Sequence, residues 1–352
     1  MKRISNIILA CTLAFGIVMA TTAIGHAAKY TFTYSTHSIP NSFQGALQKA
    51  FLDEVERLTE GRVSFRIFWG GSLLDGTEVL NAVNTGIVDA GLVNINFYPK
   101  QLQLSNALNT IQESSGTYEA MLNFFTRAFT ELPELTREVA SFNNQVMSIY
   151  AVMETGLISQ RPMTKITDIK GLKCRSATRW HLPMFTELGA TPVSVPWADV
   201  IMALQTRVID AVFSNLDAIN MSRMEDVAPN MLLFKGLYPS TPYLMTINAK
   251  KFQALPDDIK AKFREASITG QKAMAAEYEK WFNDIRESQT KAGYSITYAS
   301  AEDLATWQNL RAVEENKKLW VQESEKAGIA NAQAFLDTVY KIFDETRVTP
   351  AQ

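Results

Sequence analysis

Two arginines, Arg175 and Arg179, stand in the stretch "GLKCRSATRW" of residues 171–180, which otherwise has the pattern of a buried strand that runs into a helix. A guanidinium group is a planar fork of five donors, a geometry suited to holding a carboxylate through two parallel hydrogen bonds. The chemistry that such a group offers is the binding of an anion. A charged side chain in a buried strand therefore raises the question of which anion it meets.

Two asparagines occupy matching places in an internal repeat. Residues 78–94, "EVLNAVNTGIVDAGLVN", align without a gap on residues 199–215, "DVIMALQTRVIDAVFSN". Two similar α/β units predict two lobes, and ligands of open α/β sheets bind beyond the carboxyl ends of the strands. Asn94 and Asn215, each expected just past its strand, would then face one cleft from opposite walls. The alternative is that both cap the ends of their strands. The identical pairs are Val79/Val200, Ala82/Ala203, Thr85/Thr206, Asp89/Asp210, Ala90/Ala211 and Asn94/Asn215.

The elements that position these residues follow from hydrophobic periodicity. The first copy and the residues before it have strand and helix patterns in alternation, and this βαβαβ order predicts a parallel, doubly wound sheet in an α/β protein. The second copy has the same context. The expected strands are 30–35, 63–69, 88–93, 172–178 and 191–196, and the expected helices are 42–60, 76–86 and 181–189.

The last third of the chain has a helical pattern. From residue 255 onward, apolar residues recur at intervals of three and four, interrupted only by Gly270. A helix of more than twenty residues could span both lobes and stiffen the pair. Residues 301–328 and 332–346 are also expected to be helical and to pack on the outside of the lobes.

Residues 1–27 have the features of a cleaved signal peptide. A basic start is followed by a long apolar run and by small residues at 25 and 27, so we expect export to the periplasm. The alternative is a retained membrane anchor, because the apolar run approaches the length of a span. Cleavage leaves 32 of the 34 basic side chains against 36 acidic ones, a net charge of about −4 that argues against nucleic acid as a partner.

The whole chain has 352 residues, and without its leader it is still long enough for two domains with full cores. After cleavage Cys174 is the single cysteine, so no intramolecular disulfide can form, and no cysteine cluster offers a metal site. We expect no cofactor and no metal. The sequence has no Gly-x-Ser-x-Gly, no His-Glu-x-x-His and no glycine-rich phosphate loop, so an exported enzyme is the weaker alternative, although a Ser-His-Asp site is recognised by geometry rather than by sequence order.

Four stretches resemble the periplasmic substrate-binding subunits of TRAP transporters, the DctP type. They are "VERLTEGRVSFRIFWGGSLLDGTEVLNAVNTGIVDAG", "DIKGLKCRSA", "ELGATPVSVPWADVIMALQTRVIDA" and "YLMTINAKKFQALPDDIKAKF", in the order and spacing of that family. The resemblance implies a two-lobed fold with hinge strands and a long helix across both lobes. It also implies closure around a small organic acid (a dicarboxylate, a keto, sugar or aromatic acid, or a sulfonate) and delivery to the small and large permease subunits. A binding protein of an ATP-driven importer, or one that partners a chemoreceptor, is the alternative within this class.

The resemblance also implies site residues. The arginine of the "GLKxR" strand, Arg175 here, pairs with the ligand carboxylate in that family, and Trp197 corresponds to an aromatic residue before the second-lobe helix. The family's asparagine corresponds to Ser214 or Asn215, because "IDAVFSN" departs from the usual "DGQEN"; the repeat favours Asn215. The further positions expected to face the ligand are His37, Asn94 and Thr178.

A second arginine found in some members is replaced by Thr155, and Arg179 is the candidate substitute. Each assignment has a plainer alternative. Arg179 would be a solvated residue of the first helical turn, His37 an ordinary loop residue and Trp197 a core or hinge-packing aromatic residue. Expected boundaries are 28–152 plus 241–280 for lobe I and 153–240 plus 281–352 for lobe II, with hinges near 150–154 and 238–243. We expect a monomer.

Overall fold

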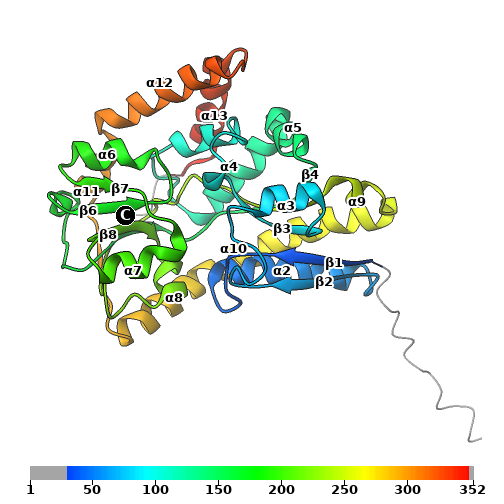
Figure 1. Ribbon diagram of the computed structural model, residues 1–352, viewed down its shortest axis with the longest axis horizontal. Coiled ribbons are helices and arrows are strands. Elements are labelled where there is room, and N and C mark those ends of the chain that lie inside the picture. Colours follow the sequence, from blue (N-terminus) through cyan, green and yellow to red (C-terminus); the bar gives the residue numbers. More distant parts are fainter. Residues whose placement is uncertain (1–29, 349–352) are drawn as a thin grey trace, which may run out of the picture.

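The computed structural model describes residues 30–348 and contains two sheets, one in each lobe (Figure 1). The expected leader, residues 1–27, lies outside the described residues. The first sheet has the order β2-β1-β3-β10-β4, and the second has the order β11-β9-β5-β8-β6-β7. The strands of the first are β1 (Tyr30–Ser35), β2 (Val63–Phe68), β3 (Ala90–Asn94), β4 (Asn144–Tyr150) and β10 (Tyr243–Asn248); those of the second are β5 (Thr155–Ser159), β6 (Lys173–Ser176), β7 (Thr191–Val193), β8 (Ala211–Asn215), β9 (Asn230–Leu233) and β11 (Ser295–Tyr298).

The expected parallel strands are parallel, but each sheet also contains an antiparallel strand. β1 pairs in parallel with β2 and β3, and β6 pairs in parallel with β7 and β8. β10 runs antiparallel to β3 and β4, and β5 runs antiparallel to β8 and β9. The physical reason is that both strands follow a crossing between the lobes. Each enters its sheet from the side at which the parallel strands have their carboxyl ends. It therefore runs in the opposite direction to them.

The internal repeat corresponds to equivalent elements in the two lobes. The identical Asp89 and Asp210 both precede the last strand of their unit and tie it to the first strand. The Asp89 carboxylate accepts from the Thr33 backbone N–H at 2.7 Å, and the Asp210 carboxylate accepts from the Lys173 backbone N–H at 2.9 Å. These aspartates are therefore structural. Ser35 pairs with Gly91 in the first sheet, while Arg175 takes the equivalent place in the second.

Helices cover both sheets. The first of them, α2, begins where the Ser42 side chain accepts from the Gly45 backbone N–H, and its apolar residues Phe43, Leu47 and Phe51 are buried. The helices are α2 (Phe43–Leu58), α3 (Val79–Thr85), α4 (Tyr118–Glu131), α5 (Pro133–Ser141), α6 (His181–Glu187), α7 (Val200–Gln205), α8 (Asp217–Ser222), α9 (Ala249–Gln253), α10 (Asp257–Lys291), α11 (Ala301–Gln308), α12 (Arg311–Lys326) and α13 (Ala332–Thr346).

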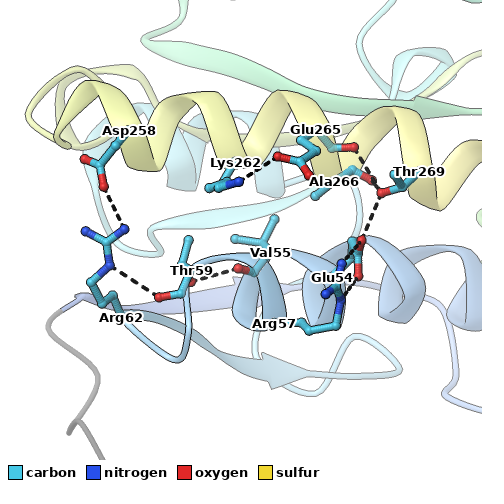
Figure 2. Close-up of polar contacts among 10 residues, drawn as sticks. All are labelled: Glu54, Val55, Arg57, Thr59, Arg62, Asp258, Lys262, Glu265, Ala266 and Thr269. Atoms are coloured by element: carbon cyan, nitrogen blue, oxygen red, sulfur yellow. Dashed lines mark hydrogen bonds and ion pairs between the residues drawn. The ribbon is translucent and has the colours of Figure 1, made fainter.

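The long helix expected after residue 255 is α10, which continues through Gly270 for 35 residues, a length of about 50 Å. It starts beside the first lobe and ends where β11 joins the second sheet (Figure 1). Figure 2 shows α10 lying along α2, with an ion pair between Arg62 and Asp258 at 2.7 Å and a hydrogen bond from Thr269 Oγ1 to Glu54 Oε1 at 3.1 Å. One helix therefore links the two lobes.

The expected helix 301–328 is divided into α11 and α12. The break occurs because the Glu187 carboxylate accepts from the backbone N–H groups of Arg311 and Ala312, at 2.9 and 2.8 Å, and so caps a new helix start. The last helix, α13, packs against α4 of the first lobe. Its position differs from the expected assignment of 281–352 as a whole to the second lobe.

The chain crosses between the sheets in two segments besides α10. Residues 151–154 connect β4 to β5, and residues 234–242 connect β9 to β10, close to the two expected hinges. Glu154 joins the two segments, because its Oε1 accepts from the Gly236 backbone N–H at 2.8 Å. Its other oxygen is buried without a hydrogen-bond partner. Burial raises the pKa of Glu154 to about 7, with a further contribution from nearby Glu279.

This buried glutamate makes stability depend on pH. The pKa of Glu154 in the folded chain, about 7, lies above its ordinary value of 4.5. Between these two pH values the folded state holds a proton that the unfolded state has released, so the folded state loses stability as the pH rises from 4.5 to about 7. We expect Glu154→Gln, which keeps an acceptor for Gly236, to match the parent near about pH 4.5 and to exceed it by about 3 kcal/mol above about pH 8. Urea unfolding of both proteins across this range measures the difference. Parallel stability curves would contradict the prediction.

Within the described residues, no helix is both long enough and apolar enough to cross a membrane.

Candidate functional site

A cavity that is partly open to solvent lies between the lobes. Its walls come from both sheets at the edge where the parallel strands end, which is the position expected for a ligand of an α/β protein. The first lobe contributes His37, Gln44, Asn94, Phe97 and Tyr243, and the second contributes Arg175, Ala177, Trp197, Ser214, Asn215, Ala218 and Met221.

Arg175 projects from β6 between its neighbours β7 and β8, and only 3% of its surface is exposed. Its Nε donates to the Val195 carbonyl at 2.9 Å, which fixes the guanidinium. Among the described residues, no carboxylate forms an ion pair with it. Burial lowers the pKa of Arg175 to about 10, so it remains charged at neutral pH. A buried, fixed and uncompensated cation at a cavity wall is suited to bind an anion.

Trp197 lies beside this arginine. It opens the short 3-10 turn Trp197–Asp199 directly after Pro196, and its ring centroid is 5.5 Å from the Arg175 guanidinium carbon. A cation above an indole face is favourable, and the rest of the half-buried ring faces the cavity. Trp197 therefore lines the cavity, and its ring offers an apolar surface there.

The two asparagines of the repeat both line the cavity, but they differ in their hydrogen bonds. Each is the last residue of its strand rather than a residue beyond it. Asn94 Oδ1 accepts from the Asn96 backbone N–H at 3.0 Å, and its Nδ2 donates to the Tyr243 hydroxyl at 3.2 Å. Asn215 Oδ1 is buried without a partner. The capping alternative therefore describes Asn94, while Asn215 keeps an acceptor for a ligand.

This difference predicts opposite behaviour of the two alanine variants. Asn94→Ala removes two hydrogen bonds inside the first lobe, so we expect it to destabilise the free protein by about 1–2 kcal/mol. Asn215→Ala should leave the free protein within about 0.5 kcal/mol and weaken ligand binding by about 5- to 20-fold. Thermal unfolding and titration calorimetry measure the two effects. Equal loss of stability in both variants would contradict the distinction.

His37 forms part of the first-lobe wall. Its ring lies 5.8 Å from that of Phe97 and 6.3 Å from that of Tyr243, measured between centroids. Its Nδ1 is buried without a hydrogen-bond partner. Burial lowers the pKa of His37 to about 4, against a smaller opposing effect of Asp75, so the imidazole is neutral at neutral pH. Ser214, half-buried, faces the cavity from β8 beside Asn215.

Two residues expected at the site lie outside this cavity. Arg179 forms an ion pair with Glu323 of α12, and its guanidinium carbon lies 4.3 Å from the Trp180 ring centroid. Thr178 lines a separate small cavity together with His181. The physical reason is that β6 ends at Ser176: Ala177 still lines the cavity, but Thr178 and Arg179 after it turn toward α6 and α12.

Other cavity residues were not expected from the sequence. Tyr243 begins β10, and its pairing with Asn94 in antiparallel register brings it to the cavity. Gln44 lies in the first turn of α2, and Phe97 closes the 3-10 turn that Asn94 caps. The stretch "YLMTIN" matched a known family, but periodicity alone could not assign Tyr243 to the cavity, because the direction of its side chain depends on pairing across the sheet.

The lobes also touch directly beside the cavity. The Asp217 carboxylate of α8, which is fully buried, accepts from the backbone N–H groups of Phe43 and Gln44 at the start of α2, both at 3.0 Å. Asn220 Nδ2 donates to the Asn41 carbonyl at 3.3 Å. These contacts join the second lobe to the first and hold Gln44 at the wall of the cavity.

Residues 34–321 match the family model of the bacterial extracellular solute-binding proteins, family 7, known as DctP. The chain belongs to this family. The resemblance found in the sequence, and with it the two-lobed α/β fold, is confirmed. The family consists of receptors that bind solutes. At the level of the family, this supports the expectation that the chain is not an enzyme.

Two curated family members and one solved structure illustrate the similarity. The 2,3-diketo-L-gulonate-binding periplasmic protein YiaO of Escherichia coli is 23% identical over 282 residues, 78% of this chain and 83% of YiaO. The C4-dicarboxylate-binding periplasmic protein DctP of Shewanella loihica is 23% identical over 319 residues, 86% of this chain and 88% of that protein. A TRAP solute-binding protein from a marine metagenome, specific for aromatic acids and solved with 3-hydroxybenzoate, superposes with a TM-score of 0.77 at 18% identity, covering 91% and 99% of the two chains.

Proposed function

We propose that this DctP-family chain is the periplasmic receptor of a TRAP transporter, which captures a small organic acid anion between its lobes and delivers it to the membrane permease. The observation that carries the proposal is Arg175, a buried cation that has no carboxylate partner among the described residues and faces the cavity between the lobes. A buried charge without a partner costs stability, so its retention is explained by a ligand that compensates it.

In this proposal the ligand carboxylate occupies the guanidinium fork of Arg175. Trp197 covers an apolar part of the ligand, and Asn215 with Ser214 contacts a polar group from the second lobe. His37 and Asn94 form the opposite wall, with Tyr243 beside them. Closure about 151–154 and 234–242 would exclude water from the cavity, and this strengthens the pair between carboxylate and guanidinium.

One pair of side chains has the residue types of a hydrolytic site. Ser176 Oγ lies 2.7 Å from His181 Nδ1, and His181 Nε2 lies 3.0 Å from Gln112 Oε1. The amide oxygen of Gln112 only accepts, so it cannot stabilise an imidazolium as a carboxylate would. Burial also lowers the pKa of His181 to about 3, which makes it a weak base. This pair therefore favours a structural role over catalysis.

A thermal-shift screen of organic acids tests the proposed function. At least one acid should raise the melting temperature of the mature protein, because a ligand that binds the folded state stabilises it by mass action. The acid should be recovered unchanged by mass spectrometry after incubation. The same screen on Arg175→Ala provides the control. Absence of any shift across the screen, or consumption of the acid, would refute a role in capture.

A further inference from the structure

The charges around the ligand cavity are few. A second cavity adjoins the first and shares His37, Phe97, Arg175, Ala177, Trp197 and Met221 with it. Among the described residues that line these two cavities, Arg175 is the single lysine or arginine, and the single carboxylate is that of Asp75. His37 adds no charge at neutral pH, because burial keeps it neutral. The site therefore supplies one positive charge.

Asp75 places a negative charge on the wall of the second cavity. Its Oδ1 accepts from the Thr77 backbone N–H at 2.8 Å and from the Thr77 hydroxyl at 2.7 Å. These hydrogen bonds lower the pKa of Asp75, so it is ionised at neutral pH. A ligand with one carboxylate on Arg175 and a second one in the second cavity would meet this like charge.

One of the buried polar atoms of the first cavity that lack a hydrogen-bond partner favours an uncharged group of the ligand. Asn215 Oδ1 from the second lobe and His37 Nδ1 from the first are both buried without a hydrogen-bond partner. An ionised carboxylate cannot donate to an amide oxygen, whereas a hydroxyl or an amide N–H can. A buried acceptor that stays unpaired in the complex reduces affinity. The Asn215 oxygen therefore favours a ligand with such a group, whereas His37 Nδ1 donates or accepts according to its tautomer and suits either kind of ligand.

We infer that the ligand is a monoanion, with one carboxylate for Arg175 and an uncharged hydroxyl or amide group for Asn215, and that Asp75 selects against dianions. This inference rests on the proposed function, and it narrows the proposed ligands from organic acid anions in general to monoanions with an uncharged polar group. It separates the chain from relatives named for C4-dicarboxylates. Arg175 decides that an acid is bound, and Asp75 and Asn215 decide which kind.

Two matched series of acids test the charge and the polar group separately. The ring series is benzoate, 3-hydroxybenzoate and isophthalate, and the chain series is pentanoate, 5-hydroxypentanoate and glutarate. Within at least one series, the hydroxylated monoacid should bind the mature protein about 10- to 100-fold more tightly than either the unsubstituted acid or the dianion. Titration calorimetry at neutral pH measures these ratios.

The outcomes separate the inference from the proposed function. If acids bind but the dianion binds as tightly as the hydroxylated monoacid, the inference is overturned and the proposed function stands. If the unsubstituted acid binds equally well, the part assigned to Asn215 is overturned. If no acid of either series binds and a wider acid screen also fails, the proposed function falls, and the inference falls with it.

Asp75→Asn provides the test of the selecting residue. It should improve binding of the dianion relative to the hydroxylated monoacid by about two- to fivefold, a modest change because Asp75 is exposed to solvent. Asp284→Asn on α10 makes the same change of charge at another exposed position and should leave the ratio unchanged. Equal ratios in both variants would overturn the role of Asp75.

Discussion

Arg175→Ala should weaken binding of the acid ligand by about 30-fold to several thousandfold. The guanidinium is buried and fixed by the Val195 carbonyl, so a carboxylate there forms a charge-assisted pair away from water. Loss of one partner of such a pair costs about 2–5 kcal/mol. Arg175→Lys keeps the charge but loses the two parallel donors, so it should recover only part of the affinity. Titration calorimetry with the ligand found by screening measures both losses.

The free protein gives the control for this prediction. Because no carboxylate among the described residues pairs with Arg175, its removal breaks no ion pair there. Removal of the buried charge offsets the lost hydrogen bond to Val195, so the melting temperature of Arg175→Ala without ligand should stay close to that of the parent. Arg179→Ala is a matched variant, since Arg179 pairs with Glu323 outside the cavity; its affinity should stay within about threefold of the parent. Near-normal affinity of Arg175→Ala would refute the acid site.

Asp217→Ala should weaken ligand binding by about 10- to 100-fold, although residue 217 does not itself contact the ligand. Its carboxylate accepts from two backbone N–H groups at the start of α2, and these would stay buried and unpaired when the lobes meet. Burial raises the pKa of Asp217, so its charge is itself costly; the contribution of the carboxylate is that it satisfies both donors. Ligand affinity falls because binding is coupled to lobe contact. Calorimetry gives the affinity, and solution scattering with saturating ligand gives the compaction.

Asp303→Ala is the matched control for this contact. The buried Asp303 carboxylate also accepts from a backbone N–H group of another element, that of Ile166 at 2.8 Å, but both lie in the second lobe. We therefore expect Asp303→Ala to lower the melting temperature of the free protein and to leave affinity nearly unchanged. The prediction for Asp217 fails if its variant binds ligand as tightly as the parent, or if it behaves like Asp303→Ala.

The sequence predicted the elements well where local signals decide them. The helix expected at 332–346 is α13, and the long helix after residue 255 is α10. It predicted less well where a distant residue intervenes. The helix expected over 301–328 is divided, because Glu187 caps a second start at Arg311. The antiparallel strands β5 and β10 were missed, because strand direction depends on where the chain re-enters a sheet.

The candidate site divides in the same way. Arg175, Trp197 and Asn215 were expected and line one cavity, since each lies near the carboxyl end of a strand of the second sheet or shortly after it. Arg179 and Thr178 lie elsewhere, because the direction of a side chain after the end of β6 depends on what packs there. Asp75 and Tyr243 could not be assigned to the cavities before the two lobes were placed against each other.

The sequence by itself determined the family, the two repeated α/β units and the arginine that would hold an acid. These features are local, because periodicity, capping residues and spacing within a unit depend on near neighbours along the chain. Only the tertiary structure decided which polar atoms remain unpaired in the cavity, where Asp75 lies, and that Asp217 of one lobe caps a helix of the other. Burial and hydrogen bonding between residues 174 positions apart, as in the contact of Asp217 with Phe43, arise only when the two lobes meet.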